Sequence, residues 1–184
     1  MKIFKYALLA IPFLYFSCSD DDDNSVPEPI NEEEVITTMT ATLTAVDGSV
    51  VVMQTQDLDG EGGEDPDVTV SGSLVSGITY AGSIEWLNEM EDEPEVITEE
   101  ILEEADEHQV FFSAGGGLDV TFEYVDFDSN GLPLGTMFSL TPNSAGEGTI
   151  TITLIHEPMK PNDGTVESAG GSTDITTTFD VVVE

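Results

Sequence analysis

Residues 35–45 read VITTMTATLTA, and this stretch decides the fold. Apolar side chains dominate the odd positions from Val35 to Ala45, and threonine fills four of the five even positions. A period of two is typical of a β-strand that buries one face. Asp47 and Gly48 follow as a two-residue turn signal, so residues 35–45 and 50–55 are expected to form a hairpin.

The same alternation recurs along the rest of the chain. Further strands are expected at residues 67–74, 78–88, 109–113, 118–126, 136–141, 148–156 and 173–183. Nine short strands with Gly, Asn and Asp between them predict an all-β, antiparallel β-sandwich, and an immunoglobulin-like order of strands is the first expectation. The one cysteine of the chain excludes an internal disulfide. Trp86 shares the parity of Ile84 and Tyr80, so its side chain is expected in the core.

Residues 96–107 interrupt the strand pattern and predict one short helix. Ile97, Ile101 and Ala105 recur at spacing four, which places them on one helix face. Thr98 is the expected N-cap, and two glutamates follow it in the first turn, where the helix dipole favours negative charge. The helix is therefore expected to pack its apolar stripe on the sandwich and to point carboxylates outward.

Charge is the extreme feature of the composition. The chain has 38 Asp and Glu but only three Lys and Arg, and its formal net charge is −35. Such a surface repels phosphate backbones, so nucleic acid is excluded as a partner. Two interpretations of the charge stay open: it keeps the protein soluble, or carboxylates that lack basic partners bind divalent cations, which relieve their mutual repulsion.

The N-terminal residues have the pattern of an exported, tethered protein. Residues 1–17 combine Lys2 and Lys5 with the apolar run ALLAIPFLYF and a small residue before Cys18, as a secretory signal peptide does. The apolar run is too short to span a bilayer. Residues 18–34, CSDDDDNSVPEPINEEE, are too charged to fold and predict an extended tether, which leaves residues 35–184 as the domain.

Several segments resemble known lipoproteins. The junction at Cys18 resembles the bacterial lipobox, and the acidic run after it resembles the tag of surface-displayed lipoproteins of the Bacteroidota. EADEHQVFF at 104–112 and HEPMKPNDG at 156–164 are similar to small acidic lipoproteins of that phylum, a group labelled "type 1 periplasmic binding fold". The resemblance implies palmitate or a similar lipid on Cys18, and display on the outer membrane at the cell surface. The label implies two α/β lobes, whereas the alternation predicts a sandwich.

The sequence favours a binding function over catalysis. No nucleophile motif, phosphate loop or dinucleotide fingerprint occurs, and carboxylate pairs arise by chance in so acidic a chain, so enzyme activity is not expected. The first hypothesis is a membrane-anchored protein that binds a divalent cation, Zn²⁺ or Ca²⁺, in association with an outer-membrane transporter. The alternative is an adhesion or ligand-binding module for protein or glycan.

Both histidines of the chain are candidate metal ligands. Glu100, Glu104 and His108 lie at spacing four and share one face if the helix extends that far. His156 continues the inward parity at the end of its strand, with Glu157 beside it. Imidazole together with carboxylate suits Zn²⁺ or a similar first-row ion. The alternative is that His108 caps a helix and His156 is an ordinary strand-end residue.

Two acidic loops are alternative calcium sites. DLDGEGGEDPD at 57–67 and DFDSNG at 126–131 place oxygen side chains at alternate positions with glycine nearby, as calcium loops do. Neither completes an EF-hand, because the carboxylate required at the twelfth position is missing. Ordinary turns explain both loops as well. The candidate ligands are Asp57, Asp59 and Glu61 in the first loop and Asp126, Asp128 and Asn130 in the second.

Overall fold

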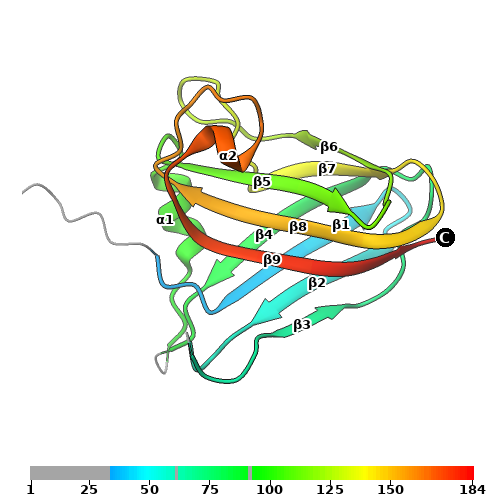
Figure 1. Ribbon diagram of the computed structural model, residues 1–184, viewed down its shortest axis with the longest axis horizontal. Helices are drawn as coiled ribbons and strands as arrows, with labels where there is room; N and C mark the ends of the chain where they lie inside the picture. The colour runs from blue at the N-terminus through cyan, green and yellow to red at the C-terminus, as the bar shows by residue number, and fades with distance from the viewer. Residues whose placement is uncertain (1–33, 61, 91–92) are drawn as a thin grey trace, which may run out of the picture. The chain divides into compact units, whose positions relative to one another are not determined.

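The computed structural model describes residues 34–60, 62–90 and 93–184, and it has the all-β sandwich that the alternation predicts. A six-stranded antiparallel sheet has the order β3-β2-β1-β4-β7-β6, and a three-stranded antiparallel sheet has the order β5-β8-β9 (Figure 1). The expected signal peptide, Cys18 and residues 19–33 of the expected tether lie outside the described residues.

The elements are β1 Thr38–Ala45, β2 Val50–Gln56, β3 Asp67–Val70, β4 Tyr80–Leu87, α1 Ile97–Glu103, β5 His108–Gly115, β6 Val120–Tyr124, β7 Met137–Pro142, β8 Gly146–His156, α2 Val166–Ala169 and β9 Ser172–Val183.

The core lies between the two sheets, and the alternation identifies its residues. Met39, Ala41 and Leu43 on the inner face of β1 are fully buried, and so is Trp86 on β4, as expected. The facing sheet contributes buried residues such as Leu154 to the same cluster. Removing an aliphatic side chain of this kind from water stabilises a fold by about 1.5–3 kcal/mol. An arrangement of two α/β lobes, which the label implies, does not describe this domain.

The β1–β2 hairpin is present, but its turn is longer than the two residues expected. Ala45 N–H donates to Ser49 O at 2.9 Å, and Gly48 N–H donates to Ala45 O at 2.9 Å, which leaves three residues in the loop. Gly48 has φ of +86°, a conformation that glycine adopts without strain. The carboxylate of Asp47 accepts the Ser49 N–H at 2.9 Å. A three-residue loop ending in left-handed glycine is a common hairpin alternative.

The order of the strands differs from the immunoglobulin-like order that we expected. Immunoglobulin constant domains divide their strands into sheets of four and three. Here β4 pairs with the side of β1 that β2 leaves open, and β7 and β6 extend the same sheet beyond β4. Six strands therefore collect in one sheet and three in the other.

Helix α1 is shorter than the expected helix at residues 96–107, and Thr98 is not its N-cap. Val96 occupies the N-cap position without a side-chain hydrogen bond. The Thr98 hydroxyl instead accepts the Trp86 N–H at 2.7 Å and donates to Trp86 O at 3.2 Å. Thr98 therefore fastens α1 to β4, and buried Ile97 and Ile101 complete the contact. No helix among residues 34–60, 62–90 and 93–184 has the length and apolar character needed to cross a membrane.

Candidate metal centre

Strands β5 and β8 bring the two histidines face to face. His108 opens β5 and His156 ends β8, and they are directly opposite each other in the antiparallel register. Their rings are stacked, with centroids 4.5 Å apart and an interplanar angle of 28°. Their exposed fractions are 0% and 2%. Figure 1 shows this end of the sandwich, where β8 finishes and β5 begins, beside α1.

Glu34 joins the two imidazole rings. Its Oε1 lies 3.0 Å from His108 Nε2, and its Oε2 lies 3.2 Å from His156 Nδ1. Only 7% of the Glu34 side chain is exposed. This glutamate was expected in the extended tether, and the structure instead makes it part of the domain, because its carboxylate bridges one nitrogen of each buried ring.

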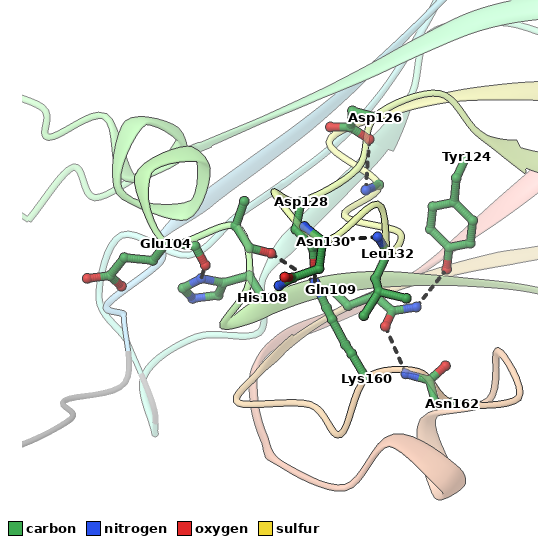
Figure 2. Close-up of polar contacts among 12 residues, drawn as sticks. Glu104, His108, Gln109, Tyr124, Asp126, Asp128, Asn130, Leu132, Lys160 and Asn162 are labelled. Carbon is green, nitrogen blue, oxygen red and sulfur yellow. Dashed lines mark hydrogen bonds and ion pairs between the residues drawn. The ribbon is translucent and has the colours of Figure 1, made fainter.

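The backbone fixes which nitrogen of His108 carries hydrogen. His108 Nδ1 lies 3.2 Å from the carbonyl oxygen of Glu104, as Figure 2 shows. A carbonyl oxygen only accepts hydrogen bonds, so Nδ1 must be the donor. A neutral His108 then presents the lone pair of Nε2 toward Glu34. A ligating histidine is commonly oriented in this way, with its second nitrogen donating to a carbonyl.

His108 Nε2 lies 3.0 Å from Glu34 Oε1. When Nδ1 carries the only ring hydrogen, both of these atoms are acceptors, and a positive charge between them is needed to make the contact favourable. A proton or a metal ion can supply that charge. His156 adds a second indication, because its buried Nε2 has no hydrogen-bond partner among the described residues. Buried polar nitrogens are normally satisfied, so His156 Nε2 is a candidate position for a ligand.

A β-bulge places Asp174 beneath the rings. In β8 and β9, Leu154 pairs with Ile175, but the next residue of β8 pairs with Thr173, so Asp174 is the extra residue. A bulge of this kind redirects a side chain that simple alternation would send outward. The carboxylate oxygens of Asp174 lie 3.9 Å from His108 Nε2 and 3.8 Å from His156 Nδ1.

The surrounding charge favours a cation. Desolvation, followed by repulsion from the carboxylates of Glu95 and Glu34, raises the pKa of Glu100 above its usual value, although the residue as a whole is exposed. Lys160 is the sole Lys or Arg among the described residues, and its Nζ is bound elsewhere, to Ala105 O at 2.8 Å and Asp128 Oδ2 at 3.3 Å. Within residues 34–60, 62–90 and 93–184, no other Lys or Arg is therefore present to pair with Glu34 or Glu100.

The ligand atoms are close enough for one ion. Glu34, Glu104, His108 and His156, which we call the histidine cluster, each offer one atom, and these atoms lie within 4.8 Å of one another. Ligands about 2.0–2.1 Å from a tetrahedral zinc ion are separated by about 3.3 Å, so modest side-chain movement would close the site. The coarse prediction of a metal-binding group is supported, and the ion's identity stays a prediction.

The expected metal ligands come together only in part. His108, His156 and Glu104 converge, but by a different route from the helix face that we expected: α1 ends at Glu103, and His108 belongs to a strand. Glu100 and Glu157 are not in the group of four. Glu157 is exposed and has φ of +50°, and its N–H donates to Glu107 O at 2.7 Å, so it serves the turn that follows β8.

The first calcium candidate uses its carboxylates within its own loop. Asp57 Oδ1 accepts the Gly60 N–H at 2.8 Å, and Asp59 Oδ2 accepts the Glu64 N–H at 3.0 Å. Glu61 lies outside the described residues. Across the described part of the chain, no group of three possible ligands forms around Asp57 and Asp59. Calcium binding here stays a prediction.

The second calcium candidate is bound more fully by protein groups. Asp128 Oδ1 accepts the N–H groups of Asn130 and Leu132, both at 2.9 Å, and its Oδ2 lies 3.3 Å from Lys160 Nζ (Figure 2). Asp126 accepts the Gly135 N–H at 2.8 Å and the Thr136 hydroxyl. Burial opposes ionisation of Asp128, but these N–H groups and Lys160 outweigh it and lower its pKa. The acids of this loop already have donors, which favours the ordinary turn.

Sequence reasoning missed Glu34 and Asp174. Nothing in the run of three glutamates at 32–34 distinguishes Glu34 from its neighbours. Asp174 does carry a signal, since it is a lone acid inside a strand of Thr and Ile, STDITTT at 172–178. Comparison of the chain with protein-family models, with curated proteins and with solved structures finds no match.

Proposed function

We propose that this chain is a lipid-anchored, surface-exposed acidic protein that binds a divalent transition-metal ion in the histidine cluster, in association with outer-membrane uptake. The observation that carries the proposal is the buried contact of Glu34 with His108 Nε2 and His156 Nδ1, in which the lone pair of His108 Nε2 faces a carboxylate oxygen. A metal ion satisfies all three groups at once.

The ligand types favour zinc or a similar first-row ion over calcium. Imidazole nitrogen is a preferred ligand of Zn²⁺, Cu²⁺, Ni²⁺ and Fe²⁺, whereas Ca²⁺ takes oxygen ligands in larger numbers. The cluster offers two imidazoles and two carboxylates, which is enough to complete a four-coordinate site. The strongly negative surface would also raise the local concentration of cations and so speed capture.

Calorimetric titration of the purified chain with Zn²⁺ tests the metal site. One ion should bind, and His108→Ala and His156→Ala should each weaken binding about a hundredfold or more, since each removes a ligand. Glu167→Gln is a matched control that removes an exposed carboxylate on α2, and it should leave affinity unchanged. Unchanged binding in both histidine variants would leave only diffuse attraction to carboxylates, and the adhesion hypothesis would then be preferred.

Acylation of Cys18 tests the anchor. The leader, the small Ser17 and the acidic run after Cys18 support cleavage and lipid attachment at this residue. Labelled palmitate should be incorporated into the chain and lost in Cys18→Ala, and that variant should leave the membrane fraction. Labelling and fractionation that are unchanged in Cys18→Ala would contradict the anchor without bearing on the metal site.

A further inference from the structure

We infer that the metal ion in the histidine cluster is a clamp that fastens the N-terminal tether to the sandwich, with Glu34 as the coupling residue. This inference rests on the proposed metal site. It adds a role that binding alone does not require, because it makes attachment of the tether depend on the ion.

Glu34 is well placed to hold the entry of the chain. The main chain first bonds to another described residue at Thr37, whose N–H donates to Leu87 O at 3.0 Å. Upstream of that point, Val35 is 57% exposed and Ile36 is partly buried against the core. Upstream of Thr37, the buried Glu34 carboxylate is therefore the polar attachment of the described segment that leads into β1.

The attachment crosses the sandwich. The segment that begins at Glu34 continues into β1, which belongs to the six-stranded sheet, whereas His108 and His156 belong to the three-stranded sheet. Glu104 follows the end of α1. One ion bound by the histidine cluster would thus join four separate parts of the chain, and Glu34 is the only one of the four ligands that precedes the first strand.

Without an ion, Glu34 is held at this site by its contacts with His108 Nε2 at 3.0 Å and His156 Nδ1 at 3.2 Å. Because His108 Nδ1 donates to Glu104 O, its Nε2 needs a proton or an ion to bind Glu34 Oε1. With an ion, His108 Nε2 and Glu34 Oε1 both become ligands of one cation. Thermodynamic linkage then requires reciprocity: the ion strengthens docking of Glu34 by the same factor by which docked Glu34 strengthens ion binding. Displacement of the tether would release metal.

The test combines proteolysis with calorimetry on the purified full chain. A protease that cuts after glutamate is applied with and without saturating Zn²⁺, and cleavage of the 34–35 bond is followed by mass spectrometry. Cleavage of a locally opened segment reports the population of the open state. We expect Zn²⁺ to slow cleavage at Glu34 about tenfold or more. The exposed Glu64 is the internal control, and cleavage after it should not change.

Two variants make the result quantitative. By linkage, the protection factor at Glu34 should equal the loss of zinc affinity in Glu34→Gln, with Glu167→Gln as the charge-matched control. His156→Ala should abolish the protection of the 34–35 bond by Zn²⁺. If His156→Ala does not fold, the clamp is decided by whether the protection factor at Glu34 equals the loss of zinc affinity in Glu34→Gln. Zinc that binds while cleavage at Glu34 stays unchanged would overturn the clamp and leave the proposed function standing. Absence of zinc binding would overturn both.

Discussion

The histidine cluster and the Asp126–Asp128 loop are both acidic, both partly buried and both predicted from sequence as cation sites, yet the structure treats them differently. In the loop, Asp128 accepts two main-chain N–H groups and pairs with Lys160. In the cluster, Glu34 faces imidazole nitrogens, one of which has its lone pair turned toward it. A carboxylate that already accepts N–H hydrogen bonds must give up or share some of its lone pairs to bind a metal ion, whereas Glu34 faces a lone pair that an ion would satisfy.

The largest effect that would sharpen this comparison is on stability, at Lys160. The Lys160 and Asp128 side chains are 5% and 0% exposed, and burial lowers the pKa of Lys160 while Asp128 opposes that shift. Lys160→Met should reduce the free energy of unfolding by about 3 kcal/mol, because it leaves a buried carboxylate without its partner. Zinc affinity should stay unchanged. Denaturant unfolding and calorimetry measure the two quantities.

A second substitution checks the cause of that loss. Adding Asp128→Asn to Lys160→Met removes the unpaired charge but keeps an acceptor for the N–H groups of Asn130 and Leu132. Part of the lost stability should return. If the double variant is no more stable than Lys160→Met, loss of packing rather than an uncompensated charge explains the effect.

Zinc should stabilise the fold by a slightly smaller amount. An ion that binds only the folded state adds about 2.7 kcal/mol at a free concentration one hundred times its dissociation constant. The gain should disappear in His108→Ala and persist in Lys160→Met, because only the first substitution removes a ligand. Unfolding curves with and without Zn²⁺ measure it. A gain that persists in His108→Ala would place the ion outside the cluster.

How far these two regions could be predicted depends on which contacts are local. Alternation and turn signals located the nine strands of the described residues, since both are local features of the sequence. It also placed His156 inward, whereas His108 was assigned to a helix face on the condition that the helix extends that far. Asp174 was missed because the bulge that redirects it depends on the register between β8 and β9. A register of this kind is a tertiary property.

Composition misled at two other places. Glu34 was expected in the tether because its neighbours are polar and charged, and its burial arises only when β5 and β8 meet. Thr98 was expected as an N-cap because a threonine before two glutamates fits a helix start, but its hydroxyl bonds to β4. In both cases a contact distant in sequence overrides a local preference. The short helix α2, capped by Thr165, was not expected at all.

A pH series should produce a still smaller effect on the unfolding free energy, and this effect concerns Asp128 in the Asp126–Asp128 loop. The pKa of Asp128 is lowered in the folded state, so its contribution to stability is fully present above its ordinary value of 3.8 and is lost as the pH falls through the lower folded value. Asp128→Asn should remove this component of acid destabilisation. Unfolding free energies of the chain and of Asp128→Asn measured below about pH 4 should converge. A constant difference across that range would show that the lowered pKa does not contribute.

Calcium should give the smallest effect. Asp57 and Asp59 each commit one oxygen to a main-chain N–H of their own loop, so an ion there must compete with the turn. Weak extracellular calcium sites have dissociation constants of about 10⁻⁴ to 10⁻³ M, so Ca²⁺ near its dissociation constant should add less than about 1 kcal/mol to the unfolding free energy. Asp59→Asn should reduce that gain.

The control for calcium is Na⁺ at matched ionic strength, because screening alone stabilises a chain with a net charge of −35. Equal stabilisation by the two salts would assign the effect to screening and the loop to an ordinary turn. Ca²⁺ could instead raise the unfolding free energy as much as Zn²⁺ does, with the increase removed by Asp59→Asn but not by His108→Ala. That result would contradict the comparison between the histidine cluster and the acidic loops. It would mean that a calcium ion can displace main-chain donors from carboxylates, and that prior hydrogen bonding does not by itself disqualify an acidic loop.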